Sequence, residues 1–217
     1  MGYLVEHDKE WGKLYRTQAK LIRKTLGNAC IATEHIGSTA IAGVPARPII
    51  DILVICKDTD ACNRLDALGY KNDDNGTYIL QGDTVGFCAR CVNANDHDTI
   101  DACMGILNQF RTSKQATQAW ADQKQAWAQQ FKDDPQGYED AKKAYFDQIS
   151  PAARDKNRQD QKLGSSLAIG MCLGMGIGTA IGAAFDNIGI GMCIGTSLGM
   201  CLGVALGSHH SKPNDKE

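Results

Sequence analysis

Two small residues and one carboxylate near the start of the chain could together hold a phosphate group. Gly37 and Ser38 follow one apolar run, and Asp51 interrupts the next. Glycine allows close approach to the backbone, and amides beside the hydroxyls of Ser38 and Thr39 can cradle an anion, more so where a helix begins. A carboxylate inside an apolar strand is costly unless it is paired or binds a metal. Asp51 could therefore hold a metal on that phosphate, or stand at a strand end and accept hydrogen bonds from the backbone or Arg47.

The elements that must position these residues can be predicted from the spacing of apolar residues. The run from Pro48 to Cys56 is rich in β-branched residues and nearly continuous in hydrophobicity, which indicates a buried strand. An amphipathic helix comes earlier, with Asp8 as its cap and Gly27 at its end. The predicted elements are a helix over 8–27, strands over 29–36 and 48–56, a short helix over 58–68, a hairpin of 77–81 and 85–92, and helices throughout 99–149. Few strands among many helices predict an α+β domain with a small mixed sheet flanked by helices.

Two sets of apolar side chains recur near helical spacing. In the first helix the stripe consists of Trp11, Leu14, Tyr15, Ile22 and Leu26. In the later helices it consists of Ile106, Phe110, Trp120, Trp127 and Phe131. Both sets are interpreted as core packing, which is favoured over an aromatic binding box.

A continuous segment around the Gly-Ser pair resembles a known family signature. The stretch H-I-G-S-T-A-I-A-G-V-P-A-R-P-I-I-D-I, from His35 to Ile52, is similar to the GrpB signature H-I-G-S-T-[AS]-V-P-G-L-x-A-K-P-I-I-D-I. The opening residues Leu4 to Trp11 resemble the entry to the family's first helix. The stretch from Gly137 to Phe146 resembles its closing helix. The resemblance covers about residues 3–150.

The resemblance implies a nucleotidyltransferase-like fold and a nucleotide substrate. In that superfamily a Gly-Ser turn holds the nucleotide phosphates and strand carboxylates hold Mg²⁺, which stabilises an in-line displacement at phosphorus. By resemblance, Gly37, Ser38 and Thr39 belong to the phosphate turn, Arg47 lies near the phosphates, and Asp51 is the first metal ligand and the catalytic carboxylate. The implied function is transfer of a nucleotidyl group from a nucleoside triphosphate with Mg²⁺ to an unknown acceptor.

Several positions depart from the family pattern. Leu53 occupies the second carboxylate position, and the stretch 87–93 lacks the H-x-H pair that relatives often carry. Arg47 stands where Lys is usual, and Ala42 replaces a proline. Asp83 is a weak second candidate for a metal ligand. The alternative is therefore a catalytically inactive protein that acts by nucleotide sensing or by membrane association and oligomerisation.

Composition sets limits on the class of protein. The 217 residues carry a net charge of −2, which fits one domain with an appendage and gives no broad electrostatic footprint for nucleic acid. No secretion signal is recognised at the start, so nine scattered cysteines indicate a reduced, cytosolic setting for the globular part. Cys88 and Cys91 form the one C-x-x-C. Alternation along a strand predicts that they point to opposite faces, which favours buried small side chains over a metal or redox site.

The composition changes abruptly at Gly164. Twelve of the 44 residues in 164–207 are glycine, a poor choice for a soluble helix because each costs ~1 kcal/mol relative to Ala. The glycines form ladders at four-residue spacing: Gly170, Gly174, Gly178 and Gly182, then Gly191, Gly195, Gly199, Gly203 and Gly207. This pattern resembles a glycine-zipper membrane hairpin, with Asp186 and Asn187 at its turn. Each arm of about 20 residues is long enough to cross a hydrocarbon core.

The flanks of this hairpin indicate its orientation and the order of domains. Basic residues precede it at Arg154, Lys156, Arg158 and Lys162 and follow it at Lys212 and Lys216. This bias predicts a membrane-associated protein with both ends and the globular domain in the cytoplasm. The predicted order is a GrpB-like domain over 1–150, a charged linker or exposed helix extension over 151–163, a transmembrane hairpin over 164–207 and a polar tail over 208–217. The tail pair His209 and His210 is interpreted as solvated, and the ladders could support a homo-oligomer.

Overall fold

The computed structural model describes residues 4–73 and 76–209, with side chains up to residue 205. It divides into two compact units between Arg154 and Asp155. The predicted basic residues Lys212 and Lys216, and His210, lie outside the described residues, as does the side chain of His209.

The first unit is built on one mixed sheet of five strands. The strands are β1 (Cys30–Ile36), β2 (Ile49–Cys56), β3 (Lys71–Asn72), β4 (Thr77–Leu80) and β5 (Gly86–Asn93). Their order across the sheet is β1-β2-β5-β4-β3, and the central pair β2 and β5 is the parallel one. The predicted α+β class is confirmed, and the predicted hairpin corresponds to β4 and β5.

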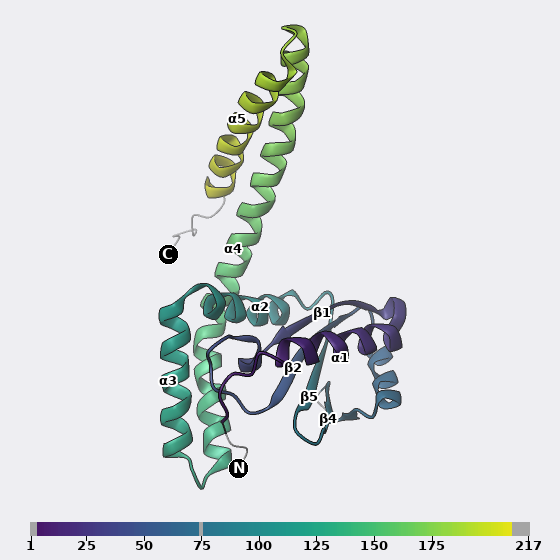
Figure 1. Ribbon diagram of the computed structural model, residues 1–217, viewed down its shortest axis with the longest axis vertical. Helices are drawn as coiled ribbons and strands as arrows, with labels where there is room; N and C mark the ends of the chain where they lie inside the picture. Colours follow the sequence, from purple (N-terminus) through teal and green to yellow (C-terminus); the bar gives the residue numbers. More distant parts are fainter. Residues whose placement is uncertain (1–3, 74–75, 210–217) are drawn as a thin grey trace, which may run out of the picture. The chain divides into compact units, whose positions relative to one another are not determined.

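Helices surround this sheet (Figure 1). They are α1 (Trp11–Leu26), α2 (His97–Thr112), α3 (Lys114–Gln130) and α4 (Pro135–Ala184), with short 3₁₀ segments η1 (Gly27–Ala29), η2 (Ser38–Ala40) and η3 (Asp60–Leu68). Helix α1 crosses one face of the sheet, and α3 runs beside the first turns of α4. The predicted helix over 58–68 is therefore a 3₁₀ segment, and β3 was not predicted because a two-residue strand has no periodicity to detect.

The main core lies between α1 and the sheet. Ile22 and Leu26 of α1 pack against Ile50, Ile52 and Val54 of β2, all fully buried. The predicted stripe is correct except at one position. Leu14 is 36% exposed, since it lies at the edge of the apolar face.

The start of α1 differs from the prediction. The helix begins at Trp11 and not at residue 8. Asp8 accepts a hydrogen bond from the backbone of Glu10, so its carboxylate closes the turn before the helix instead of capping the helix itself.

A second core joins α2, α3 and α4. Trp120 is almost fully buried and stacks on Phe110 and on Tyr145, with ring centroids 5.8 Å and 5.0 Å apart. Trp120 and Trp127 are in a T-shaped, edge-to-face arrangement. The interpretation of the aromatic stripe as packing is confirmed for Phe110 and Trp120. Phe131 ends the stripe as the C-terminal cap of α3.

The cysteines of β5 lie on opposite faces, as predicted. Cys91 packs with the buried thiols of Cys56 and Cys62, whose sulfur atoms are 3.4 Å apart. Cys88 instead lines a pocket on the other face. Among the described residues, no three His, Cys, Asp or Glu side chains are arranged to hold a metal.

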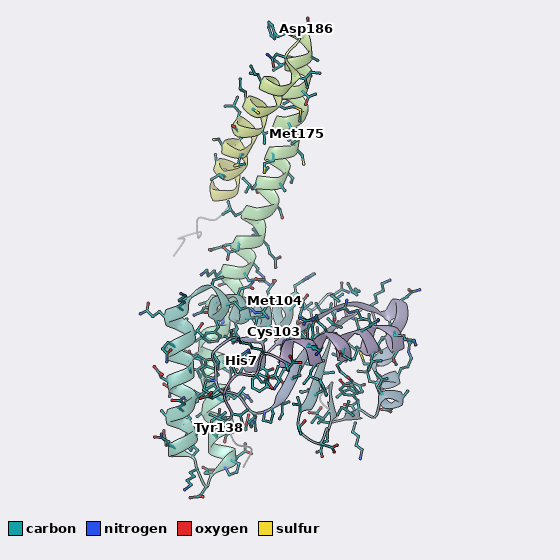
Figure 2. All side chains as sticks on the ribbon, viewed as in Figure 1. His7, Cys103, Met104, Tyr138, Met175 and Asp186 are labelled. Carbon is teal, nitrogen blue, oxygen red and sulfur yellow. The ribbon has the colours of Figure 1, made fainter. Side chains whose placement is uncertain are left out.

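The second unit consists of the end of α4 and α5 (Ile188–His209). The helices reverse direction at Asp186, labelled in Figure 2, which has a positive φ of 51°. Residues 151–163 are helical, which corresponds to the predicted helix extension. Both helices contain a stretch long and apolar enough to cross a membrane, judged by length and composition.

The two glycine ladders face each other inside this hairpin. A Cβ on Gly174 would overlap the carbonyl oxygen of Gly195 and lie 2.7 Å from Cα of Gly199. The same backbone contacts recur along the hairpin, for example between Gly178 and Gly191. The outer surfaces carry Ile and Leu side chains that are more than half exposed, as a lipid-facing surface requires.

Candidate functional site

The predicted phosphate turn lies at the end of β1. Gly37 has φ +73° and ψ −174°, a conformation open essentially to glycine, and η2 begins directly after it. Asp51 pairs with Ile36 in the sheet register, so its side chain rises beside the turn. A Cβ on Gly37 would overlap Oδ2 of Asp51 and lie 3.0 Å from its Cγ. The structure thus brings Gly37, Ser38 and Asp51 together.

A buried hydrogen bond spans this turn. His35 Nε2 lies 3.0 Å from the hydroxyl of Thr39, and that hydroxyl donates to the carbonyl of Ile49. Because Thr39 has only one proton to donate, His35 must donate from Nε2. Burial, with Arg111 nearby, lowers the pKa of His35 to about 4, so the ring is neutral. The ring also stacks on Tyr15 at 4.8 Å. These contacts hold the two ends of the turn together.

Thr39 lines a pocket beside the turn, but its hydroxyl is committed to protein partners. Thr39→Val should lower the free energy of unfolding by about 1–3 kcal/mol, because the buried donor of His35 loses its acceptor. Denaturant unfolding measures this loss. An unchanged free energy of unfolding would mean that the hydroxyl is not the acceptor of His35.

A pocket of about 280 Å³ opens beside the turn. Its charged lining consists of one carboxylate, Asp51, and three cations, Arg47, Lys124 and Lys142. The other lining residues are Leu4, Ser38, Thr39, Ala46, Ile49, Ile79, Cys88 and Tyr138. With more basic than acidic groups beside a glycine turn, the pocket is suited to an anion.

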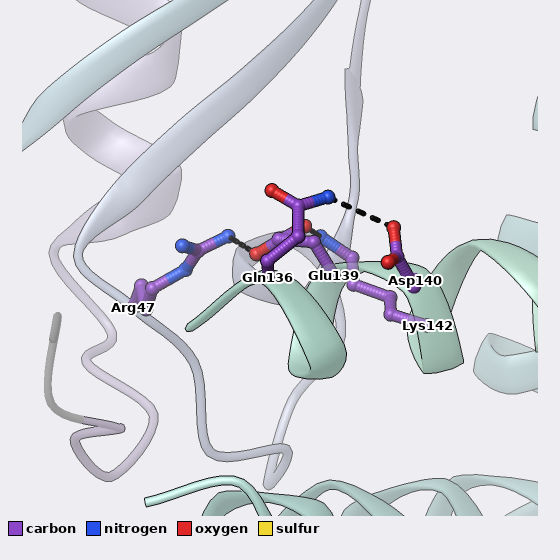
Figure 3. Close-up of polar contacts among 5 residues, drawn as sticks. All are labelled: Arg47, Gln136, Glu139, Asp140 and Lys142. Atoms are coloured by element: carbon purple, nitrogen blue, oxygen red, sulfur yellow. Dashed lines mark hydrogen bonds and ion pairs between the residues drawn. The ribbon is translucent and has the colours of Figure 1, made fainter. Parts of the chain in front are cut away.

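Two of the cations are held by one glutamate (Figure 3). Arg47 donates to Glu139 at 2.5 Å, and Lys142 lies 3.4 Å from the other oxygen of the same carboxylate. On the helix, Gln136 in turn donates to Asp140. Glu139 thereby positions two of the basic groups that line the pocket, and it partly offsets their charge.

Lys124 is the deeply buried cation. Its side chain is only 3% exposed, donates to the carbonyl of Pro45 and lies over the ring of Trp120 at 5.7 Å. Burial, with added repulsion from Lys142 and Arg47, lowers the pKa of Lys124 to about 7. An anion in the pocket would favour its charged form.

Opposing effects act on the pKa of the Asp51 carboxylate. Burial raises its pKa, while Lys142, a hydrogen bond with the Cys88 thiol and Arg47 act in the opposite direction. The pKa of Cys88 rises to about 12 through burial and the adjacent carboxylate, so that thiol stays protonated. A carboxylate with a raised pKa is a better proton acceptor than an ordinary aspartate.

The residues around Asp51 do not fit a resident magnesium centre. Mg²⁺ prefers several oxygen ligands, whereas the pocket offers one carboxylate facing three basic side chains. Leu53 is fully buried, and its cross-strand neighbours are Glu34 and Arg90. Asp83 lies exposed in the turn between β4 and β5 and is not part of the pocket lining. A metal at Asp51 therefore stays a prediction.

Sequence reasoning missed two of the three cations. Lys142 lies in the stretch that resembles the family's closing helix, but nothing in its spacing relates it to Asp51. The position of Lys124 in the sequence does indicate an unusual environment. This lysine lies four residues after Trp120 and three before Trp127, on the aromatic face of α3, where a solvated lysine is not expected.

Comparison with known families covers nearly the whole chain. Residues 3–151 match the family described as GrpB protein, and residues 160–209 match the family described as glycine zipper membrane protein. The second match and the two apolar helices together indicate a membrane-associated region.

Individual relatives match shorter parts. A UPF0157 protein of Halalkalibacterium halodurans is 38% identical over 87 residues, 40% of this chain and 38% of that protein. The glutamate-rich protein GrpB of Alkalihalophilus pseudofirmus is 39% identical over 72 residues, 31% of this chain and 41% of its own length. The chain thus aligns with about two fifths of these relatives.

A solved structure supports the fold. The conserved protein GrpB from Enterococcus faecalis superposes with a TM-score of 0.63 and 23% identity, and it covers 71% of this chain and 98% of its own. The match extends over a mixed five-stranded sheet flanked by helices. Since the family match spans more than half of the sequence, the chain belongs to the GrpB family, and a glycine-zipper membrane-associated region follows its GrpB domain.

Proposed function

We propose that the pocket around Asp51 binds a nucleoside triphosphate through its phosphates, and that the domain transfers the nucleotidyl group to an acceptor hydroxyl. One observation carries the proposal: three cationic side chains from a loop and two helices converge on the turn that Gly37 and Asp51 form together. Arg47 and Lys142 are the groups placed to contact phosphate oxygens by charge-assisted hydrogen bonds.

The transfer needs a proton acceptor near phosphorus. The acceptor oxygen attacks the α-phosphorus and forms a new P–O bond, the bond to the bridging oxygen breaks, and pyrophosphate leaves with that electron pair. The hydroxyl proton passes to the carboxylate of Asp51, whose raised pKa suits this role. The basic side chains stabilise the charge that develops on the phosphoryl oxygens.

Binding without transfer is the second candidate. The fully buried Leu53 in place of a second carboxylate favours it, because a lone acid beside three cations is a weaker catalytic centre than an acid pair. In that case the domain would sense nucleotide, and membrane association or oligomerisation through the hairpin would be the output.

The orientation of the chain is part of the proposal. The basic residues before the hairpin, from Arg154 to Lys162, support a GrpB domain in the cytoplasm and a turn at Asp186 on the other side. A cytoplasmic nucleotide pool would then be accessible to the pocket. Protease protection of the domain in inside-out vesicles would contradict this orientation.

Calorimetric titration of the full chain in nanodiscs tests the binding. Tripolyphosphate and a panel of nucleoside triphosphates are titrated with and without Mg²⁺. Lys142→Ala should weaken binding about 10- to 100-fold, since it removes a charge-assisted hydrogen bond. Lys132→Ala is the matched control, an exposed lysine that does not line the pocket. Equal affinities for the two variants would contradict the proposed site.

Asp51→Asn separates the two possible roles of the carboxylate. If Asp51 is only a negative charge among the cations, the variant should bind tripolyphosphate more tightly in the absence of Mg²⁺. If it also holds Mg²⁺ on the nucleotide, the variant should lose any gain in affinity that Mg²⁺ gives. Release of pyrophosphate in the presence of candidate acceptors, absent in the variant, would establish transfer over sensing.

The buried lysine predicts a pH dependence. Lys124 is charged below its pKa of about 7 and neutral above it, so the affinity for tripolyphosphate should fall as pH rises from 6 to 8. Titration of the phosphate itself acts in the opposite direction. Lys124→Met provides the reference, and the ratio of the two affinities should fall several-fold over this range. A constant ratio would show that Lys124 does not contribute its charge to binding.

A further inference from the structure

A second, larger cavity lies against the same turn. It has a volume of about 620 Å³, and its walls are the end of β1, the turn, α2, α3 and the part of α4 that belongs to the first unit. Its lining includes Gly37 and Ser38, and Ser38 also lines the cationic pocket. Cys103, which lines this cavity, and Tyr138, which lines the cationic pocket, are both labelled in Figure 2.

The inner wall of this cavity is apolar and partly aromatic. Phe146 is the partly exposed ring of this wall. Phe110 and Trp120 lie almost fully buried behind it, where Trp120 stacks on both Phe110 and Tyr145. Because these rings are packed against one another, the wall is preformed. Rigid apolar walls of this kind accept flat ring systems without a cost for ordering side chains.

The rim of the cavity is polar and carries both signs of charge. Arg90 and Lys143 supply hydrogen-bond donors, Asp147 supplies a carboxylate acceptor, and Ser150 supplies a hydroxyl. The apolar wall and mixed rim together suit a neutral ring system with donors and acceptors at its edges. They do not suit a polyanion, which the neighbouring pocket would take.

We propose that this cavity binds the nucleoside part of the nucleotide whose phosphates occupy the pocket of Arg47, Lys124 and Lys142. The inference rests on the proposed function and extends it, since it assigns the base and sugar to a separate cavity across the turn. A single ligand would then pass over Ser38, which lines both cavities. A separate acceptor molecule is the competing occupant, and the test distinguishes the two.

The test compares the affinity for a whole nucleoside triphosphate with the affinities for its phosphate part and its nucleoside part. Full-length protein in nanodiscs is titrated with tripolyphosphate, with adenosine, guanosine, cytidine and uridine, and with the four triphosphates. At least one triphosphate should bind tighter than tripolyphosphate by about tenfold or more, the effect of placing one base on an aromatic wall. Its nucleoside should bind weakly on its own.

Filling the cavity should remove only the nucleoside contribution. Ala102→Phe places a ring into the cavity from α2, and Ala126→Phe adds the same ring at an exposed position of α3 as the control. In Ala102→Phe the affinity for the preferred triphosphate should fall to that for tripolyphosphate, which itself should not change. Retained tripolyphosphate binding also shows that the variant is folded. If the variant does not fold, the comparison of triphosphates with tripolyphosphate in the wild-type protein still tests the inference.

Two results would overturn the inference and leave the phosphate site intact. One is equal affinity of the wild-type protein for tripolyphosphate and all four triphosphates. The other is a loss of transfer in Ala102→Phe with unchanged triphosphate affinity, which would assign the cavity to the acceptor. Failure of tripolyphosphate to bind at all would instead remove the proposed function itself.

Discussion

Gly37→Ala should weaken phosphate binding at least tenfold and destabilise the domain. The backbone conformation of Gly37 costs other residues about 1–3 kcal/mol. In addition, the new Cβ would overlap Oδ2 of Asp51, so the carboxylate must leave its position between the turn and Cys88. We expect a decrease of several degrees in Tm and at least a tenfold loss of tripolyphosphate affinity, measured by thermal unfolding and calorimetry.

Gly43→Ala is the matched control for this variant. Gly43 has a similar φ of +80°, but no described atom lies within 4 Å of the position of its Cβ. It should therefore lower the Tm through strain alone and keep tripolyphosphate affinity within about twofold. Equal losses of affinity in the two variants would show that strain in the loop, and not contact with Asp51, controls the site.

Gly174→Leu should separate the two helices of the hairpin. The ladder brings backbone against backbone, and a leucine at this position would have to occupy the space of Gly195 and Gly199. Spin labels at the outward-facing Ile169 and Leu202, introduced after the exposed cysteines are replaced by serine, report the separation in nanodiscs. The exposed cysteines are Cys172, Cys193 and Cys201. The distance distribution should broaden and shift to longer values.

Gly176→Leu provides the comparison on the same helix. Gly176 is two residues away and has no described atom within 4 Å of its Cβ position, so a side chain there would face outward. Its label distances should match those of the wild type. If Gly174→Leu also left them unchanged, the helices would not be held by the ladders.

The site could be predicted from sequence where its parts are close in the chain. Gly37 and Asp51 lie on one strand-turn-strand segment, and antiparallel pairing of β1 with β2 brings them together. The glycine ladders were predictable for the same reason, because one tight turn at Asp186 aligns them. In both cases local spacing determines which residues meet.

The remainder of the pocket depends on long-range packing. Lys124 reaches the carbonyl of Pro45, and Glu139 reaches Arg47, only because α3 and α4 fold back over the loop before β2. Stacking around Trp120 sets that geometry, and no local pattern encodes which helical face meets which loop. The edge position of Leu14 was unpredictable for the same reason, since helical spacing gives the apolar stripe but not its width against the sheet.

The glycine ladders also limit how the hairpin can change during evolution. Where two side chains pack, a larger residue on one helix can be accommodated by a smaller one on the other. Here the partners of the central ladder glycines, such as Gly195 opposite Gly174, are already glycines and cannot become smaller. Damage to one ladder thus has no second-site suppressor on the facing helix. A genetic screen for revertants of Gly174→Leu should return true reversion or replacement by another small residue at the same codon.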